Sequence, residues 1–510
     1  MWDYLVLTAS NALQARAYEM QVEARRRCGL LPQVREVLVV PDPEGQRIGS
    51  GGSTLLCLTR ILEREPRRLS ELRILIVHAG GDSRRLPAYG PCGKIFVPLP
   101  SRCDAPLPVT LFDRLVPDFL ALPPGVPGRG QVVVAAGDAL VRFDASQVRF
   151  AKAGLTAIGC YVTPEEASRH GVFCVGPGDM ASLYLQKPSL AVQQSTGAID
   201  ALGRVALDAG VMSLDAEAAQ CLLDAFGPVE AALASEIDLY REVCCALGSA
   251  ATLDHYLESV RSSGSSWKAD ALSRLFPMLN RIPLHVQLVP TCRFLHFGST
   301  RQLIESGRAL AAEDCGGEPS STVLVVNSAI VQPAQVHGRD SWLEACRIAA
   351  DVRFAGQNVV VGVDIDAPLA LPSGACLEVL EGRNRAGRDV WFVRCYGVLD
   401  TFKQNAQFCG RPLGDWLCTA GIEADEVWPD VSDPAGRSLW NARVFPAAPV
   451  AADFRRWLWM YRPESATVEE LREFRTADRY SAAEIAVLAN QPAFHSRRLE
   501  IWKGRPWQSD

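Results

Sequence analysis

The sequence predicts an α/β protein whose N-terminal half folds around a mostly parallel β-sheet covered by helices on both faces. Two observations support this fold class. Short apolar runs of buried-strand length alternate with helix-forming segments over roughly the first 280 residues, and glycine-rich turns follow two of these runs. A third observation sets the C-terminal half apart, because short apolar segments follow one another closely from about Leu284. The 510 residues are enough for two or three domains.

The N-terminal pattern fixes an order of elements along the chain. We expect strands at residues 3–9, 35–40, 74–77, 131–136, 155–162 and 205–211, and helices at residues 10–28, after residue 54 and over residues 215–260. In such sheets ligands collect beyond the carboxyl ends of the strands. The loops that follow these strands are therefore where a functional site is expected.

The C-terminal half has two textures. From Leu284 to about Val398 the short apolar segments are separated by turns, which is typical of a β-helix or a β-sandwich. Their spacing is too irregular to decide between the two. Near the end, capping boxes start at Thr467 and Ser481, each with Glu three residues later, and these predict two helices.

Composition excludes several classes of protein. A net charge of −6 and a pI near 5.8 argue against a general binder of nucleic acid or of an anionic membrane. No apolar run reaches the ~18 residues needed to span a bilayer, and the N-terminus lacks the positive charge of a signal peptide. The sixteen cysteines form no CxxC pair, which is typical of reduced thiols in a cytoplasmic protein.

The stretch from Leu72 to Pro98 is the strongest candidate for a phosphate site. Its apolar strand ends at Gly80-Gly81, and the cations Arg84, Arg85 and Lys94 follow. Glycines let backbone N–H groups approach oxyanions, and the cations neutralise the charge. The plain alternative is a surface turn with solvated arginines, but the length and order of the pattern favour a polyphosphate.

A second glycine-rich turn runs from Gly49 to Thr54. It lacks the third glycine of GxGxxG and the GK[ST] ending of a P-loop, so it is neither a dinucleotide fingerprint nor a Walker loop. As a helix N-terminus it still offers N–H groups to a phosphate or a base edge. A simple tight connection between strand and helix explains the turn equally well.

Two acids and one lysine complete the candidate site. Asp138 follows the apolar strand at 131–136, and Asp208 lies inside an otherwise apolar segment, where an unpaired carboxylate is costly. Carboxylates suit Mg²⁺, although an Asx turn or a helix cap is the commoner role of a Gly-Asp pair. Lys187 precedes a proline and is therefore held extended, as a residue reaching into a site would be.

These blocks occur together in an order that resembles a known family. They are GSGGST at 49–54, HAGGDSRRLPAYGPCGK at 78–94, GD at 137–138, HGVF at 170–173, LQKPS at 185–189, LDAGV at 207–211, EIDLY at 236–240, FLHFGST at 294–300, FCGRPLGDWL at 408–417 and LWNARVFP at 439–446. The segment at 78–94 resembles the loop of sugar-1-phosphate nucleotidyltransferases. The whole set resembles the fucose-1-phosphate guanylyltransferase portion of the fucokinase/GDP-fucose pyrophosphorylase family.

The resemblance implies a fold and a reaction. The expected domains are a Rossmann-like nucleotidyltransferase domain at residues 1–283, a parallel β-helix at 284–446 and a helical C-terminal tail at 447–510. The expected reaction joins a sugar-1-phosphate, in the first place L-fucose-1-phosphate, to GTP and releases pyrophosphate, with Mg²⁺ as cofactor. The sugar and the base rest on the resemblance alone.

The resemblance also implies a role for each candidate residue. The implied catalytic residues are Arg85, Lys94 and Lys187; the nucleotide-binding residues are Gly49, Gly51, Gly52, Gly80, Gly81, Ser83 and Arg84; the sugar-binding residues are His170, Gly171 and Gly210; and the metal ligands are Asp138 and Asp208. Arg85 is expected on the departing β- and γ-phosphates, and Lys187 on the sugar phosphate.

Two departures from the family pattern matter. The chain contains no P-x-x-x-G-L-G-S-S kinase loop, so a kinase step is expected on a separate sugar kinase. Ser83-Arg84 also replaces the Gly-Thr of the broader nucleotidyltransferase loop. One alternative is a non-catalytic nucleotide-sugar-binding regulatory partner of such a kinase, which the intact set of charges argues against. Another is a sugar kinase using residues 49–54, which fails because no lysine follows those glycines.

Overall fold

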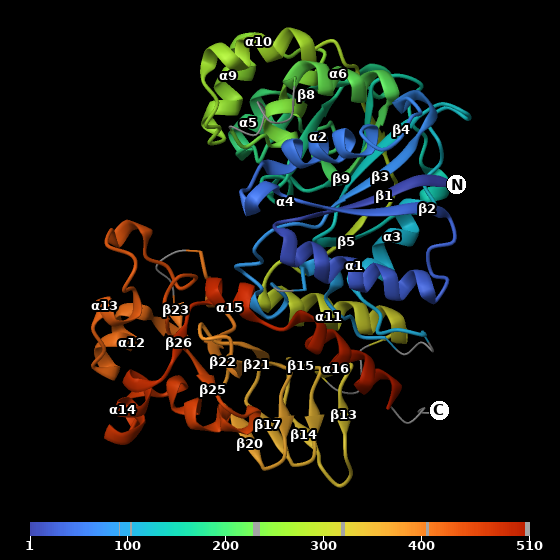
Figure 1. The fold of residues 1–510 in the computed structure, drawn as a ribbon. Coiled ribbons are helices and arrows are strands. Elements are labelled where there is room, and N and C mark those ends of the chain that lie inside the picture. Colours follow the sequence, from blue (N-terminus) through green and yellow to red (C-terminus); the bar gives the residue numbers. More distant parts are fainter. Residues whose placement is uncertain (91, 102–104, 228–234, 318–321, 404–406, 505–510) are drawn as a thin grey trace. The chain divides into compact units, whose positions relative to one another are not determined.

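The computed structural model describes residues 1–90, 92–101, 105–227, 235–317, 322–403 and 407–504 (Figure 1). The chain divides into two compact units, each discontinuous in sequence. Unit 1 contains residues 1–80 and 113–294, and unit 2 contains residues 81–112 and 295–510. The expected domain boundaries at 283/284 and 446/447 stay predictions. The division assigns Arg85 and Lys94 to unit 2, and both candidate metal ligands to unit 1.

Unit 1 is built on a mixed sheet with the strand order β10-β6-β9-β4-β3-β1-β2. Its strands are β1 (Trp2–Ala9), β2 (Val34–Pro41), β3 (Arg73–His78), β4 (Gln131–Ala136), β6 (Leu155–Val162), β9 (Val205–Asp215) and β10 (Leu284–Leu288). The pairs β1–β2, β1–β3, β3–β4 and β6–β10 are parallel. β9 runs antiparallel to its neighbours β4 and β6. All six expected strands are thereby confirmed, but the sheet is mixed rather than mostly parallel.

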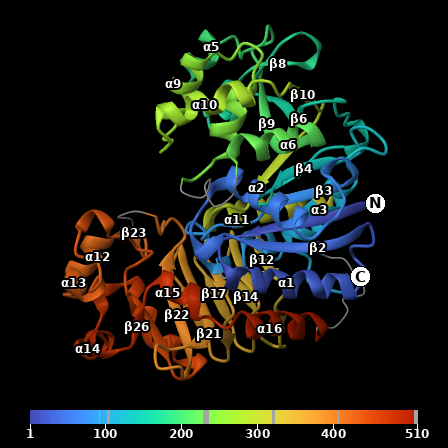
Figure 2. The ribbon, with the colours of Figure 1, turned by 45° about the horizontal axis from the view of Figure 1, so that its top comes forward.

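Helices cover both faces of this sheet, as expected. Figures 1 and 2 show α1 (Ala12–Arg27) and α2 (Gly49–Leu62) on opposite sides of β1, β2 and β3. The face that carries α2 also packs α6 (Ala216–Phe226), α9 (Leu253–Ser262) and α10 (Ala269–Leu279) into one apolar core. On the other face the buried Arg25 of α1 pairs with Asp113 at 2.6 Å.

The helical prediction for residues 215–260 is wrong in its middle. Residues 228–234 lie outside the described part of the chain, and residues 235–238 are not helical. Ile237 instead pairs with the start of α2, donating to the Ile48 carbonyl at 2.9 Å. The chain then forms a π-helix, η7 (Leu239–Cys244), and a single turn, α8 (Cys245–Leu247), before α9.

A hairpin extends the sheet of unit 1 beyond β9. It consists of β7 (Gly171–Val175) and β8 (Ala181–Gln186), which pair antiparallel with each other. β7 also pairs with β9, with Val172 opposite Leu207. The hairpin therefore carries the segments around His170 and Lys187 on either side of its open end.

Unit 2 contains three ladders of short parallel strands. Successive coils of the chain add one strand to each ladder, and Figure 1 shows the strands stacked side by side. The first ladder is β12 (Val323–Val326), β15 (Ser341–Glu344), β18 (Val359–Val361) and β21 (Ala375–Arg383); the second is β13 (Ala329–Ile330), β16 (Arg347–Ile348) and β19 (Asp364–Ile365); the third is β14 (Val336–His337), β17 (Val352–Phe354) and β20 (Leu369–Leu371). Every residue of β15 and β18 is buried, whereas in β17 Val352 and Phe354 are buried and Arg353 between them is exposed.

The first ladder continues into antiparallel strands and is followed by helices. The antiparallel strands are β22 (Asp389–Gly397), β25 (Phe445–Ala448) and β26 (Arg479–Tyr480), and the helices of unit 2 include α11 (Thr300–Cys315), α12 (Leu413–Ala420), α13 (Ala424–Val427), α14 (Val468–Thr476), α15 (Ala482–Leu488) and α16 (Gln491–Lys503). Both predicted capping boxes are confirmed: Thr467 caps α14 and Ser481 caps α15. No helix in the described ranges is long and apolar enough to cross a membrane.

The segment that follows Gly80 is anchored to unit 2 through its backbone. The carbonyl of Arg84 accepts from the Phe402 N–H at 3.1 Å, and that of Arg85 from the Thr300 N–H at 2.9 Å. The Pro87 carbonyl accepts from the guanidinium of the buried Arg394 at 3.0 Å. Arg394 in turn is paired with Glu378, which is fully buried. The backbone around Arg85 is therefore fixed at three points.

A second buried ion pair ties α16 to the ladders and to the same segment. Arg498 donates to both carboxylate oxygens of Glu344, at 3.0 and 3.1 Å. Tyr89 also donates to Glu344, at 3.4 Å, and accepts from the Trp342 indole at 2.9 Å. Glu344 and Trp342 are completely buried. Removing one charge of such a pair is costly because the other stays buried without a partner.

We expect the Arg498→Met substitution to lower the free energy of unfolding by about 3–5 kcal/mol, because it leaves the Glu344 carboxylate buried and unpaired. Denaturant titration of the purified protein measures this. Replacing both partners, in Arg498→Met/Glu344→Met, should recover most of the loss. The control is Arg301→Met, which breaks an exposed pair with Glu305 and should cost less than about 1 kcal/mol. An equally small loss for Arg498→Met would show that the buried pair does not hold α16.

Candidate active site

The two candidate metal ligands lie on neighbouring strands of unit 1, Asp138 just past the end of β4 and Asp208 inside β9. In the antiparallel pair of β4 and β9, Ala135 lies opposite Val211. Asp138 is just past the end of β4, and Asp208 precedes Val211 on β9, so the register brings both to one edge of the sheet. Burial is the main reason why the pKa of Tyr240 is raised, and the negative charges of Asp208 and Asp138 raise it further. Both carboxylates are therefore close to one phenol.

Asp208 is held by two hydrogen bonds. It is 7% exposed, and it accepts from the Gly210 N–H at 2.8 Å and from the Tyr184 hydroxyl at 3.0 Å. Burial raises the pKa of Asp208 to about 6, although both hydrogen bonds lower it. Gly210 turns its N–H back to this carboxylate with φ +72°, a conformation that favours glycine. The φ angle and the hydrogen bond to Asp208 thus explain why residue 210 is glycine.

The donor set fits a magnesium ion that substrate oxygens complete. Among the described residues, no group of three or more His, Cys, Asp or Glu side chains is placed to hold a metal. Magnesium in nucleotide sites is commonly bound by one or two carboxylates together with substrate phosphates. Asp138 is exposed and Asp208 is buried, and a cation bound beside the buried carboxylate would stabilise its charged form.

The hairpin brings Lys187 and His170 together. The Lys187 N–H donates to the His170 carbonyl at 3.0 Å, and the Lys187 side chain is exposed. Lys187 has φ +50° rather than the extended backbone expected from the following proline, so that part of the prediction is wrong. The hydrogen bond to His170 holds this turn. The His170 ring stacks on Phe294 with ring centroids 6.3 Å apart.

Close packing explains the glycines at the start of α2. The N–H groups of Gly51 and Gly52 donate to the Ile237 carbonyl at 2.8 and 3.2 Å. A Cβ atom on Gly49 would lie 2.2 Å from the same oxygen, and Gly49 has φ +79°. These N–H groups are thus engaged within the protein. The nucleotide contact expected of the three glycines stays a prediction.

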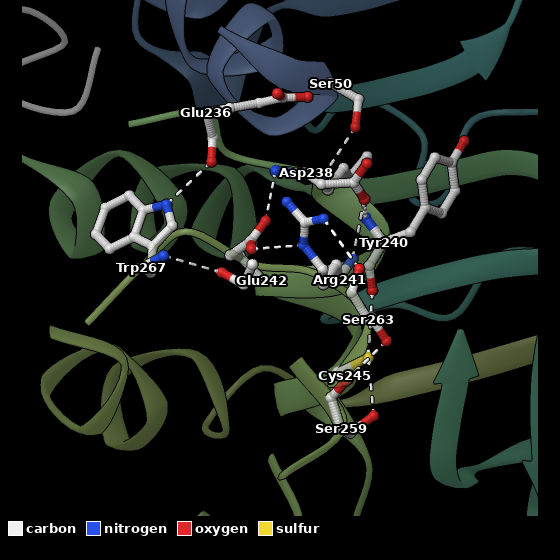
Figure 3. A network of polar contacts seen from close by, with 12 residues as sticks. Ser50, Glu236, Asp238, Tyr240, Arg241, Glu242, Cys245, Ser259, Ser263 and Trp267 are labelled. Atoms are coloured by element: carbon white, nitrogen blue, oxygen red, sulfur yellow. Dashed lines mark hydrogen bonds and ion pairs between the residues drawn. The ribbon is translucent and has the colours of Figure 1, made fainter. Parts of the chain in front are cut away.

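A polar network fixes the EIDLY segment beside the acids (Figure 3). Asp238 caps η7 by accepting from the N–H groups of Tyr240 and Arg241 at 2.9 and 3.0 Å. The N–H of Asp238 donates to the fully buried Glu242 at 2.6 Å. In Figure 3 the Tyr240 ring projects away from this network. Its hydroxyl lies 3.9 Å from the position that a Cβ atom on Gly210 would occupy.

The sequence did not single out three further side chains at this edge of the sheet. They are Tyr184 on β8, Tyr240 on η7 and His78 at the end of β3. His78 Nε2 lies 3.0 Å from Thr54 Oγ1, and burial lowers the pKa of His78 to about 4. The imidazole is therefore neutral at pH 7. Tyr240 and His78 lie within the EIDLY and HAGGDSRR blocks, and Tyr184 directly precedes LQKPS. The sequence alone does not separate these three side chains from the other residues of the blocks.

The cationic segment is divided between the two units. Gly80 belongs to unit 1, where its N–H donates to Thr8 Oγ1 at 3.3 Å. In unit 2, Gly81 has φ +126° and the buried Ser83 has φ +55°. Both values fit a tight turn ahead of the arginines. Lys94 begins the short 3-10 helix η4 (Lys94–Phe96) and is half-buried.

The two arginines of this segment are placed differently. Arg84 pairs with Asp82 at 2.9 Å and lies over the Trp440 ring at 5.2 Å from its centroid. Arg85 is exposed. One of its terminal nitrogens lies 3.7 Å from the position of a Cβ atom on Gly298. Arg85 is thus the more exposed of the two arginines, whereas Arg84 is partly buried and contacts Asp82 and Trp440.

Comparison with known proteins identifies the family of the chain. The model of the fucose pyrophosphorylase domain matches residues 66–450. The bifunctional fucokinase/GDP-fucose pyrophosphorylase of Arabidopsis thaliana is 27% identical over 96% of this chain and 51% of its own length. The L-fucokinase/L-fucose-1-P guanylyltransferase of Bacteroides fragilis is 25% identical over 92% and 48%. The fucose-1-phosphate guanylyltransferase of Mus musculus is 26% identical over 87% and 83%.

The chain spans about half the length of the two bifunctional relatives and most of the mouse enzyme. The family match covers most of the chain, including the cationic segment, both acids and the parallel ladders. The chain therefore belongs to the fucose pyrophosphorylase domain family.

Proposed function

We propose that this protein is a nucleotidyltransferase that joins L-fucose-1-phosphate to GTP, giving GDP-L-fucose and pyrophosphate. The observation that carries the proposal is the pair of carboxylates, with Asp138 just past the end of β4 and Asp208 inside the neighbouring strand β9. The names of the relatives support the choice of sugar and nucleotide. The reaction transfers a nucleotidyl group between phosphate oxygens, so the protein's task is to position charged groups and neutralise them.

Within unit 1, the carboxylates of Asp138 and Asp208 would hold the metal. A bound magnesium ion would supply charge neutralisation at the α-phosphate and the incoming sugar phosphate. The hydrogen bonds from Gly210 and Tyr184 keep the Asp208 carboxylate in one orientation. Lys187 would neutralise the sugar phosphate, because its ammonium is exposed on a turn whose backbone is hydrogen-bonded to His170.

Within unit 2, Arg85 would bind the departing β- and γ-phosphates. Its guanidinium is exposed, and its backbone is fixed by the hydrogen bond from Thr300. A guanidinium offers paired N–H donors that match two phosphate oxygens. Lys94 would add a second cation on the same segment. Arg84, held against Asp82 and Trp440, would support the turn rather than meet the nucleotide directly.

Finer features of the architecture belong to the same proposal. We infer that unit 1 is a Rossmann-like nucleotidyltransferase fold and that the three parallel ladders of unit 2 form a short parallel β-helix. The stacking of one strand per coil in each ladder supports the second assignment. The domain boundaries, a separate sugar kinase as partner and a cytoplasmic location are further parts of the proposal.

A single set of incubations tests the function. The purified protein is mixed with Mg²⁺ and with GTP plus fucose-1-phosphate, or with ATP plus free fucose. Pyrophosphate and GDP-fucose from the first mixture support the proposal, and ADP from the second supports a sugar kinase. Binding of GDP-fucose without turnover in either mixture supports the regulatory alternative. A panel of nucleotides and sugar-1-phosphates then establishes the base and the sugar.

We expect Asp138→Asn to lower turnover about a hundredfold or more, because it removes one charged ligand while keeping the shape of the side chain. Release of pyrophosphate measures the effect. Asp138 is exposed, so the fold should be unaffected. The control is Asp254→Asn, which changes an exposed acid in the first turn of α9 and should leave the rate unchanged. Turnover within twofold of the wild type would remove Asp138 from the site.

We expect Arg85→Ala to weaken the use of GTP and to slow turnover, with a combined loss in kcat/KM of roughly 10- to 100-fold. This is the size expected from losing a hydrogen-bonded contact to a charged group. Steady-state kinetics with GTP as the varied substrate measures it. Arg353→Ala, at an exposed position on β17, is the matched control. Unchanged kinetics in Arg85→Ala would mean that the segment is an ordinary solvated turn.

A further inference from the structure

The buried hydroxyl of Tyr184 contacts the candidate metal ligand directly. Tyr184 is 1% exposed, and its hydroxyl donates to Asp208 Oδ2 at 3.0 Å. A second acceptor, Gln186 Oε1, lies farther away at 3.4 Å. Oδ1 of the same carboxylate accepts from the Gly210 N–H. Each oxygen of Asp208 thus has one protein donor, and each keeps a lone pair for a further ligand.

The position of the Tyr184 ring is set by the hairpin. Tyr184 on β8 pairs with Phe173 on β7, and the two rings meet edge to face with centroids 5.2 Å apart. Phe173 is completely buried and also pairs with Ala206 on β9. The Tyr184 ring therefore packs against Phe173, and its hydroxyl is bonded to Asp208 on β9, so the hydroxyl has little freedom to move.

Gly171 provides the space for this hydroxyl. A Cβ atom on Gly171 would lie 1.9 Å from the Tyr184 oxygen and 2.6 Å from the ring carbon that bears it. No side chain fits there unless the ring moves. The backbone of Gly171 does not require glycine, because its φ is outside the left-handed region. Residue 171 is glycine because the Tyr184 hydroxyl fills the space of a side chain, and not because of its backbone conformation.

We infer that Tyr184 is a positioning residue for Asp208 and that Gly171 is glycine because the Tyr184 hydroxyl occupies its side-chain space. This inference rests on the proposed function, in which Asp208 holds the metal. It assigns Gly171 a different role from the sugar contact that the resemblance implies. It also connects Lys187, three residues after Tyr184, to the metal ligand through one short hairpin.

The test measures metal binding separately from turnover. Mn²⁺ replaces Mg²⁺ as the probe, and its binding to the nucleotide-loaded protein is followed by electron paramagnetic resonance. Tyr184→Phe removes one hydroxyl and keeps the ring. We expect the Kd for Mn²⁺ to rise about tenfold or more, as is typical when the partner of a metal ligand is lost. Tyr161→Phe, on an exposed tyrosine of β6, should bind Mn²⁺ like the wild type.

The Gly171→Ala variant approaches the same bond from the other side. It should displace the Tyr184 ring and raise the Kd for Mn²⁺ in the same direction, while the KM for fucose-1-phosphate changes less. The double variant Tyr184→Phe/Gly171→Ala should lose much less than the product of the two single effects, because both substitutions break one hydrogen bond. Thermal unfolding of each variant confirms that it is folded.

Three outcomes would overturn the inference. One is wild-type affinity for Mn²⁺ in Tyr184→Phe. Another is a Gly171→Ala variant that raises only the KM for fucose-1-phosphate, which would restore the sugar contact. The last is a wild-type protein that does not bind Mn²⁺ at this site, as shown by equal affinity in Asp208→Asn. A protein that binds Mn²⁺ as expected but makes no GDP-fucose would refute the proposed function and leave the positioning role intact.

Discussion

The antiparallel pairing of β9 with β4 is the constraint on which the candidate site of unit 1 depends. β9 runs antiparallel to β4, and the register places the middle of β9, not its end, beside the carboxyl end of β4. That placement brings Asp208, a residue inside a strand, to the edge where Asp138 follows β4. Asp208 is 7% exposed, and a buried carboxylate is costly unless it is hydrogen-bonded or paired. Its hydrogen bonds come from Gly210 and Tyr184.

In unit 2, hydrogen bonds and buried ion pairs fix the backbone of the segment that follows Gly80. The segment after Gly80 carries the exposed Arg85, and its apolar side chains Leu86 and Tyr89 are buried. Its carbonyls also accept hydrogen bonds from Phe402, Thr300 and Arg394. Arg394 forms a buried ion pair with Glu378, as Arg498 does with Glu344. The ladders and helices of unit 2 thus have a task beyond their own stability, since they hold the backbone around Arg85.

The sequence predicted the six strands of unit 1 correctly and drew attention to the two acids for a clear physical reason. Buried strands are apolar runs, so an acid such as Asp138 just beyond one, or Asp208 within one, departs visibly from the pattern. Tyr184 and His78 give no such signal, because a tyrosine or histidine in a strand is ordinary. The non-helical turn at Ile237 was missed since its partner, the start of α2, lies almost 190 residues away. The assignment of residues 81–112 to unit 2 is equally non-local.

The resemblance implies substrate contacts for several glycines, whereas the structure gives packing or backbone reasons for the same residues. Gly49 and Gly51 make room for Ile237, Gly52 makes room for the Ile48 side chain, and Gly171 makes room for the Tyr184 hydroxyl. Gly210 bends an N–H toward Asp208. Each can be essential without touching a substrate. Backbone N–H groups that are already paired contribute little to anion binding, so the charged side chains must supply most of it. Affinity for phosphate in this protein should therefore follow Arg85, Lys94 and Lys187 more closely than the glycine-rich turns that first marked the site.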